Sequence, residues 1–154
     1  MNKIPKVLFL SRGSASRGQM AEGFLRSLAS EQFIPFSAGT EASAVHPLAR
    51  EVMSEAGVDI SAQQPREVAS LFRETFQYVV VLCDETRERY PVYPFTRNLV
   101  KWSVFDPEFA AQDPESRKQA FRQVRDQMRG RVEQFIQTMN QPNGGLPKVH
   151  AMAA

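Results

Sequence analysis

Short apolar runs alternate with longer amphipathic stretches along this chain, and the alternation restricts the possible fold more than any other feature. The runs at 7–10 and 78–83 are continuous and aliphatic, which is typical of strands buried on both faces. Weaker strands are expected at 33–36, closed by Gly39, and at 99–104. Proline cannot donate a hydrogen bond to a neighbouring strand, so a proline within 33–36 predicts the edge of a sheet.

Amphipathic helices are expected between these strands, because apolar residues recur there every three to four positions. Leu28 is one of the apolar positions of the first helix. Pro47 suits the first turn of the second helix and Gly57 its end. Asp84 is placed to cap a short helix after the strongest strand. The expected helices span residues 17–29, 47–56, 65–72, 85–90 and 114–139.

Strands that alternate with helices form a parallel sheet, because each connection has to cross a face of the sheet. We therefore expect an α/β protein, a three-layer sandwich with a four-stranded parallel sheet and helices on both faces. The chain of 154 residues suffices for one core and shows no internal repeat, so a single domain is expected over residues 5–139. Residues 140–154 lack periodicity and are expected to form a flexible tail.

Composition excludes several classes of function. One Cys and two His leave no zinc-type spacing, so no metal site is expected, and the single Cys favours a reducing, cytoplasmic location. A net charge of +2 is too small to predict nucleic-acid binding. No run approaches the roughly 18 apolar residues of a membrane span, and the nucleotide loops GxxxxGK and GxGxxG are absent. The oligomeric state stays open.

The segment between the first strand and the first helix has the composition of an anion-binding loop. Small residues let successive backbone N–H groups point at one ligand, and the positive end of the helix dipole lies at the same place. Arg17 can donate two hydrogen bonds to a tetrahedral oxyanion. The alternative is an ordinary loop before a helix that starts with arginine. The candidate oxyanion-binding residues are Ser11, Arg12, Gly13, Ser14, Ala15, Ser16 and Arg17.

A family resemblance rests on several motifs in order along the chain. The first strand, loop and helix read VLFLSRGSASRGQMAEGFL, and further motifs follow at residues 37–40, 45–47, 57–61, 81–84, 101–102 and 106–107. Over about residues 5–139 the chain resembles the low-molecular-weight protein tyrosine phosphatase superfamily, whose signature is Cys, five residues, then Arg. The stretch from Gln19 to Gly23 is typical of the arsenate reductase branch.

The resemblance implies a role for three residues. In the family a cysteine thiolate attacks the phosphate or arsenate, loop amides and an arginine hold its oxygens, and an aspartate before proline protonates the leaving group. Ser11 stands at the position of that cysteine, Arg17 matches the arginine and Asp106 the general acid. Phosphate, arsenate or sulfate is therefore the expected ligand.

Serine changes the chemistry expected at position 11. A helix N-terminus beside an arginine can lower a cysteine pKa from about 8.5 to roughly 3.5–7.5, but an alcohol stays protonated there and needs a general base. His46 is the only histidine outside the tail, and its match to the Val-His-Pro segment of the family favours a role in starting the helix instead. We therefore expect oxyanion binding with impaired or absent turnover.

The origin of Ser11 has two interpretations. A deliberate Cys-to-Ser change would trap ligand, whereas a natural member could have lost its nucleophile. Ser14 stands where the family usually has asparagine, and Gly18 replaces a usual serine that supports the thiolate. Several departures in one loop favour natural divergence.

Cys83 is the redox candidate. It matches the second redox cysteine of thioredoxin-coupled arsenate reductases, but Tyr90 stands where those proteins have their third. Even a Ser11→Cys variant would therefore need Cys83 alone or an external small thiol to complete reduction, and no cofactor is implied. The alternative for Cys83 is a small buried hydrophobic residue.

Two kinds of function follow from these residues. One is an enzyme scaffold of the arsenate reductase or tyrosine phosphatase type, active when position 11 is Cys. The other is an inactive module that binds phosphate or a phosphorylated protein.

Overall fold

The centre of the fold is a parallel sheet of four strands in the order β2-β1-β3-β4. The computed structural model describes residues 3–13, 16–41, 43–96, 98–110 and 112–142. The predicted α/β class and four-stranded parallel sheet are confirmed, with Pro35 in the edge strand β2. The strands are β1 (Lys6–Gly13), β2 (Ile34–Glu41), β3 (Tyr78–Cys83) and β4 (Leu99–Ser103).

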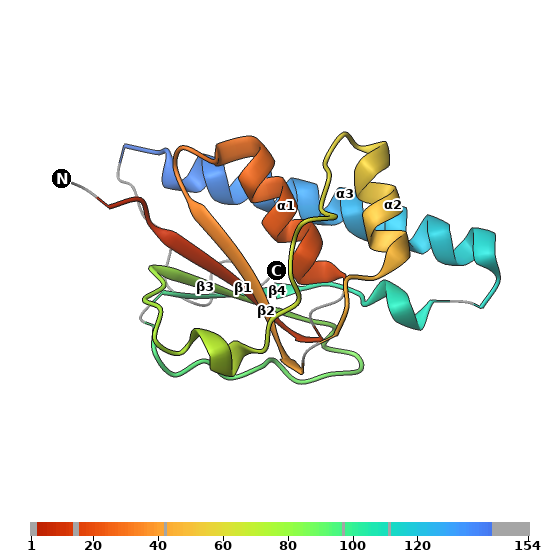
Figure 1. Cartoon of the computed structure of the whole chain (residues 1–154), viewed down its shortest axis with the longest axis horizontal. Helices are drawn as coiled ribbons and strands as arrows, with labels where there is room; N and C mark the ends of the chain where they lie inside the picture. The colour runs from red at the N-terminus through yellow and green to blue at the C-terminus, as the bar shows by residue number, and fades with distance from the viewer. Residues whose placement is uncertain (1–2, 14–15, 42, 97, 111, 143–154) are drawn as a thin grey trace.

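Three α-helices cover one face of the sheet (Figure 1). Side chains from alternate positions of the strands, such as Phe9 and Trp102, pack against Phe24 and Phe121 from the helices, and all four are at most 1% exposed. The helices are α1 (Arg17–Ala29), α2 (Pro47–Glu55) and α3 (Pro114–Met139). None of the helices in the described ranges is long and apolar enough to cross a membrane.

The opposite face has a thinner cover. Leu8 and Val81 pack there against Leu71 of the 3-10 helix η1 (Val68–Leu71) and against Phe76 and Tyr93 of the loops. This third layer completes the predicted sandwich. A prediction of a helix over 65–72 was too long, because only one 3-10 turn forms there.

The ends of two helices follow their sequence signals. His46 Nδ1 accepts a hydrogen bond from the backbone N–H of Leu48 at 3.1 Å, and Pro47 opens α2. Gly57 has a φ of 81°, the left-handed conformation that stops a helix. Asp113 caps α3 by accepting from the N–H of Ser116 at 3.0 Å. The predicted role of His46 in starting α2 is confirmed.

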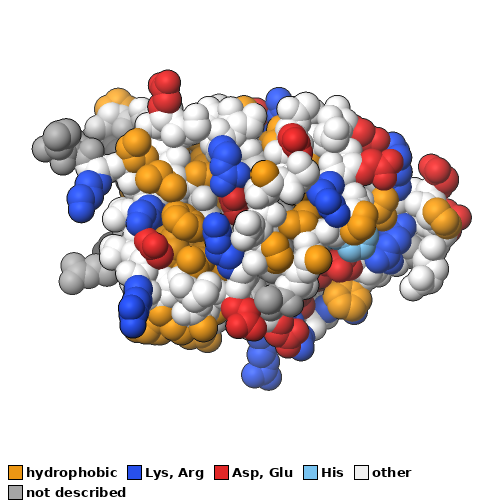
Figure 2. Space-filling view, in the orientation of Figure 1, with side chains coloured by type: hydrophobic (Ala, Val, Ile, Leu, Met, Phe, Trp, Pro, Cys, Tyr) orange, Lys and Arg blue, Asp and Glu red, His pale blue; other side chains and the backbone are white. Residues whose placement is uncertain are grey.

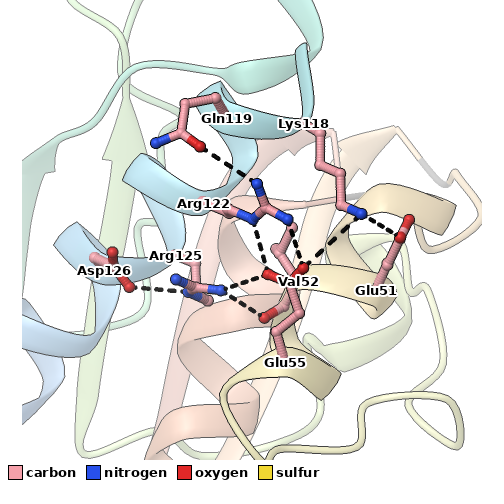
Figure 3. Close-up of polar contacts among 8 residues, drawn as sticks. All are labelled: Glu51, Val52, Glu55, Lys118, Gln119, Arg122, Arg125 and Asp126. Atoms are coloured by element: carbon pink, nitrogen blue, oxygen red, sulfur yellow. Dashed lines mark hydrogen bonds and ion pairs between the residues drawn. The ribbon is translucent and has the colours of Figure 1, made fainter. Parts of the chain in front are cut away.

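An ion-pair network joins α2 to α3 (Figure 3). Glu55 accepts from Nε and Nη2 of Arg122 at 2.9 and 2.7 Å and from Nη1 of Arg125 at 3.0 Å. Lys118 donates to Glu51 at 2.6 Å, and Arg125 also donates to the carbonyl oxygen of Val52 at 2.9 Å. Basic residues of α3 are therefore used to position α2.

The predicted ends of the first two strands were wrong. The first strand was expected to end at Leu10, yet β1 continues because Ser11 and Gly13 pair with Gly39 and Glu41 of β2. Small residues do not end a strand when the neighbouring strand extends beside them. For the same reason β2 does not close at Gly39, and it begins at Ile34, one residue later than predicted.

Two helical predictions also fail locally. Residues 85–87 form a single turn, and no helix continues through residues 88–90. At the start of the turn Asp84 Oδ1 accepts from both the N–H and Oγ1 of Thr86, at 3.1 and 2.6 Å. Leu28 is 41% exposed, while Ala29 is buried. Ala29 lies four residues after the buried Leu25 and thus shares its face of α1.

Candidate active site

Ser11 lies at the carboxyl end of a central strand, next to the start of α1. Its side chain is fully buried, and its Oγ donates to the carbonyl oxygen of Gly13. A Cβ atom built on Gly18 would lie 3.7 Å from this Oγ, which places the hydroxyl beside the first turn of α1. Ligands of parallel α/β sheets bind at this edge, where the chain leaves β1 toward one side and β3 toward the other.

The loop itself is shorter than the sequence suggested. Ser11, Arg12 and Gly13 belong to β1, and Ser11 and Gly13 pair with residues of β2. Ser14 and Ala15 lie outside the described residues. Ser16 directly precedes α1 and is 2% exposed, and its Oγ donates to Glu108 at 3.3 Å.

Arg17 is the buried cation of the site, with a side chain only 3% exposed. It donates to Glu88 through Nη1 at 2.7 Å and Nη2 at 3.2 Å, and through Nη1 to the carbonyl oxygen of Val104 at 3.2 Å. Its Nη2 also lies 3.5 Å from Oδ2 of Asp106. The fold therefore brings Arg17 and Asp106, two of the three predicted catalytic residues, together. The third, Ser11, lies beside Gly18, the residue that follows Arg17.

The Asp106 side chain interacts with two neighbouring residues, one through each carboxylate oxygen. Its Oδ1 accepts from the N–H of Glu108 at 3.0 Å and caps the 3-10 helix η2 (Pro107–Phe109). Its Oδ2 faces Arg17, and the residue is 9% exposed. The carboxylate is thus held in one orientation at the rim of the site, where a general acid could meet a leaving group.

Glu88 is the site residue that sequence reasoning missed. Burial raises the pKa of this carboxyl group, but hydrogen bonds from Arg17 and from the backbone N–H of Asp84 outweigh burial and hold the pKa below its usual value. The group is therefore a carboxylate at neutral pH. No signal in the sequence separates Glu88 from Glu85, which bonds to Tyr90 instead at 2.6 Å.

Cys83 lies at the end of β3 with 1% exposure. Burial, followed by the nearby Glu88 carboxylate, raises the pKa of its thiol to about 11. Such a thiol stays protonated at neutral pH, whereas a redox nucleophile needs a thiolate. These features favour the packing role for Cys83.

The surroundings of the site are charged and open to solvent. A cleft of about 630 Å³ leads to Glu88, lined by residues 12, 40, 85–89 and 91. On the face shown in Figure 2, basic side chains are scattered among acidic, polar and apolar ones. Within the described residues no group of three or more His, Cys, Asp or Glu could hold a metal ion.

Fold and site together define a class of α/β proteins in which a buried arginine starts the first helix beside the end of the first strand. The chain belongs to the low molecular weight phosphotyrosine protein phosphatase family, whose sequence model matches residues 6–143. This confirms the family resemblance found in the sequence.

Relatives place the chain near the arsenate reductases within that family. An arsenate reductase of Halalkalibacterium halodurans is 34% identical over 138 residues, which cover 90% of this chain and 99% of the relative. A glutaredoxin arsenate reductase of Synechocystis sp. is 32% identical, with 86% and 97% covered. A solved arsenate reductase in the phosphate binding state has a TM-score of 0.75 and 31% identity, with 86% and 97% covered.

Proposed function

We propose that this protein binds phosphate, arsenate or a related tetrahedral oxyanion at the start of α1, and that Ser11 leaves it with little or no turnover. The observation that carries the proposal is Arg17, a buried arginine at a helix N-terminus that lies 3.5 Å from Asp106 and directly precedes Gly18, the glycine beside Ser11. A buried guanidinium donates two parallel hydrogen bonds to an anion, and the helix dipole favours negative charge at the same point.

Position 11 decides whether binding leads to chemistry. The Ser11 hydroxyl donates to Gly13. Among the described residues it has no histidine beside it, because His46 accepts from Leu48 at the start of α2. An alcohol without a general base remains a weak nucleophile. The remaining residues therefore bind and orient the oxyanion without forming a covalent intermediate.

Calorimetric titration with phosphate, arsenate and sulfate tests this function. The chain is compared with Arg17→Lys, which keeps the charge but loses the planar pair of donors. We expect binding of the unchanged chain and an affinity about tenfold weaker or more in the variant, since hydrogen bonds between charged groups are lost. Arg50→Ala, on the exposed side of α2, is the matched control. If all three proteins bind these anions with equal affinity, Arg17 is not part of the binding site.

A catalytic scaffold is the second candidate function, and the Arg17 to Asp106 distance of 3.5 Å favours it. In this role a Cys at position 11 attacks the oxyanion, Arg17 holds the oxygens and Asp106 protonates the leaving group. An external thiol would complete arsenate reduction, and the name of the Synechocystis relative suggests glutaredoxin as a reductant class. A cytoplasmic location agrees with such a reductant.

A further inference from the structure

The Glu88 carboxylate occupies the donors that an oxyanion would use. Both terminal nitrogens of Arg17 point at Glu88, one at each carboxylate oxygen. The two side chains are 3% and 8% exposed, so little water competes for these bonds. A carboxylate bound in this two-point geometry resembles two oxygens of a phosphate or arsenate ion.

Glu88 directly follows a short surface turn and does not belong to the apolar core. The turn is closed by Asp84, whose backbone N–H donates to Glu88 Oε1 at 2.9 Å. Glu85, Thr86 and Arg87 between them are exposed. The Glu88 side chain can therefore leave Arg17 without disturbing buried apolar residues, and the cleft of about 630 Å³ provides space beside it.

We propose that Glu88 sets the affinity and selectivity of the site by acting as an internal ligand of Arg17 that every oxyanion must displace. The inference rests on the proposed oxyanion-binding function. A doubly charged tetrahedral ion offers more charge and more oxygens than the carboxylate it replaces. A planar, singly charged anion such as formate offers Arg17 the same charge and the same two oxygens as the Glu88 carboxylate. The carboxylate thus admits phosphate and arsenate at reduced affinity and excludes simple carboxylates.

The test titrates phosphate and formate into the chain, Glu88→Gln and Glu88→Ala. Glu88→Gln keeps the side-chain volume and one acceptor, whereas Glu88→Ala vacates the position. Glu85→Gln is the matched control, because Glu85 lies in the same turn and bonds to Tyr90. We expect phosphate to bind about tenfold more tightly or better to both Glu88 variants, with no change for Glu85→Gln.

Formate distinguishes an internal ligand from a residue that only positions Arg17. In Glu88→Ala, formate should bind to Arg17 in the position that the Glu88 carboxylate leaves, and it should compete with phosphate. The unchanged chain should show no formate binding. Unfolding midpoints of the variants are measured alongside, and Glu88→Gln remains informative if Glu88→Ala unfolds.

Two outcomes overturn the inference in different ways. If the chain binds phosphate and the Glu88 variants bind it equally or more weakly, Glu88 is not a competitor, while the proposed function stands. If none of the proteins binds phosphate, arsenate or sulfate, the proposed function fails and the inference fails with it.

Discussion

Arg17 and Asp106 face each other across the carboxyl edge of the sheet, with Nη2 of Arg17 lying 3.5 Å from Oδ2 of Asp106. The arginine starts α1 and the aspartate caps η2, so two loops far apart in sequence meet at this contact. The pair places a buried cation and a carboxyl group at the same point.

Ser11→Cys should gain hydrolysis of p-nitrophenyl phosphate at mildly acid pH, because a thiolate beside Arg17 and the N-terminus of α1 is stabilised. Adding Asp106→Asn should lower that rate by about 10²–10⁴, the usual contribution of a general acid. Steady-state rates of the chain and the two variants are compared. If the Ser11→Cys variant binds phosphate but does not hydrolyse the substrate, the residues around position 11 do not support catalysis.

Gly18→Ser should fit and should help a thiolate at position 11. The new Cβ would meet Ser37 Cβ at 3.5 Å and Ser11 Oγ at 3.7 Å, both ordinary contacts. In a Ser11→Cys background the added hydroxyl should lower the pKa of the new thiol, because it can donate to the charged form. Thiolate absorbance against pH measures the difference between the single and double variants. An unchanged pKa would place the hydroxyl away from the sulfur.

Two glycines should respond to alanine in opposite directions. Gly23→Ala should cost about 1–3 kcal/mol, because its Cβ would lie 2.6 Å from Cγ2 of Ile60 and 3.2 Å from Cε of Met53. Gly130→Ala should stabilise by about 0.5–1 kcal/mol, since Gly130 lies inside α3 with no heavy atom within 4 Å of the new Cβ. Urea unfolding of both variants checks the signs. If Gly23→Ala stabilises the protein, the Ile60 side chain moves away from the new methyl group at little cost in free energy.

Glu55 should make stability fall in acid. The hydrogen bond from Arg122 is the largest cause that lowers the pKa of Glu55 to about 2. The unfolded value is about 4.3, so the stabilisation is fully present above that pH and is lost as the pH falls through about 2. Glu55→Gln should therefore be less stable than the chain near pH 6, and the difference should narrow between about pH 4 and 2. Unfolding curves across this range, repeated in high salt, measure it. A difference that does not change with pH would exclude the charge as its source.

Cys83 should resist thiol reagents in the folded protein. Its burial and its pKa of about 11 leave almost no thiolate at pH 8. Because the chain has one Cys, a chromogenic disulfide reagent should report no fast thiol before denaturation and one after it. Rapid labelling of the native chain would restore Cys83 as a redox candidate.

Periodicity in the sequence determined most of the architecture. The apolar run at 78–83 is short and rich in valine, which is typical of a buried strand. The apolar residues at 114–139 recur every three to four positions, which is typical of a long helix. Pro47 and Gly57 likewise act through their own backbone restrictions, so both ends of α2 were predictable. The motif order was enough to find the family.

Tertiary structure decided what the sequence left open at the site. The turn at 85–87 depends on the Asp84 side chain and on the Glu88 side chain, which accepts from the backbone N–H of Asp84, and these contacts outweigh a weak local preference for helix. Ser11 and Gly13 join the sheet because β2 extends beside them. Glu88, the partner of Arg17, has no sequence pattern around it that would predict this contact. Periodicity reports which face of an element is buried, but the pairing of two charges depends on where separate loops meet in space.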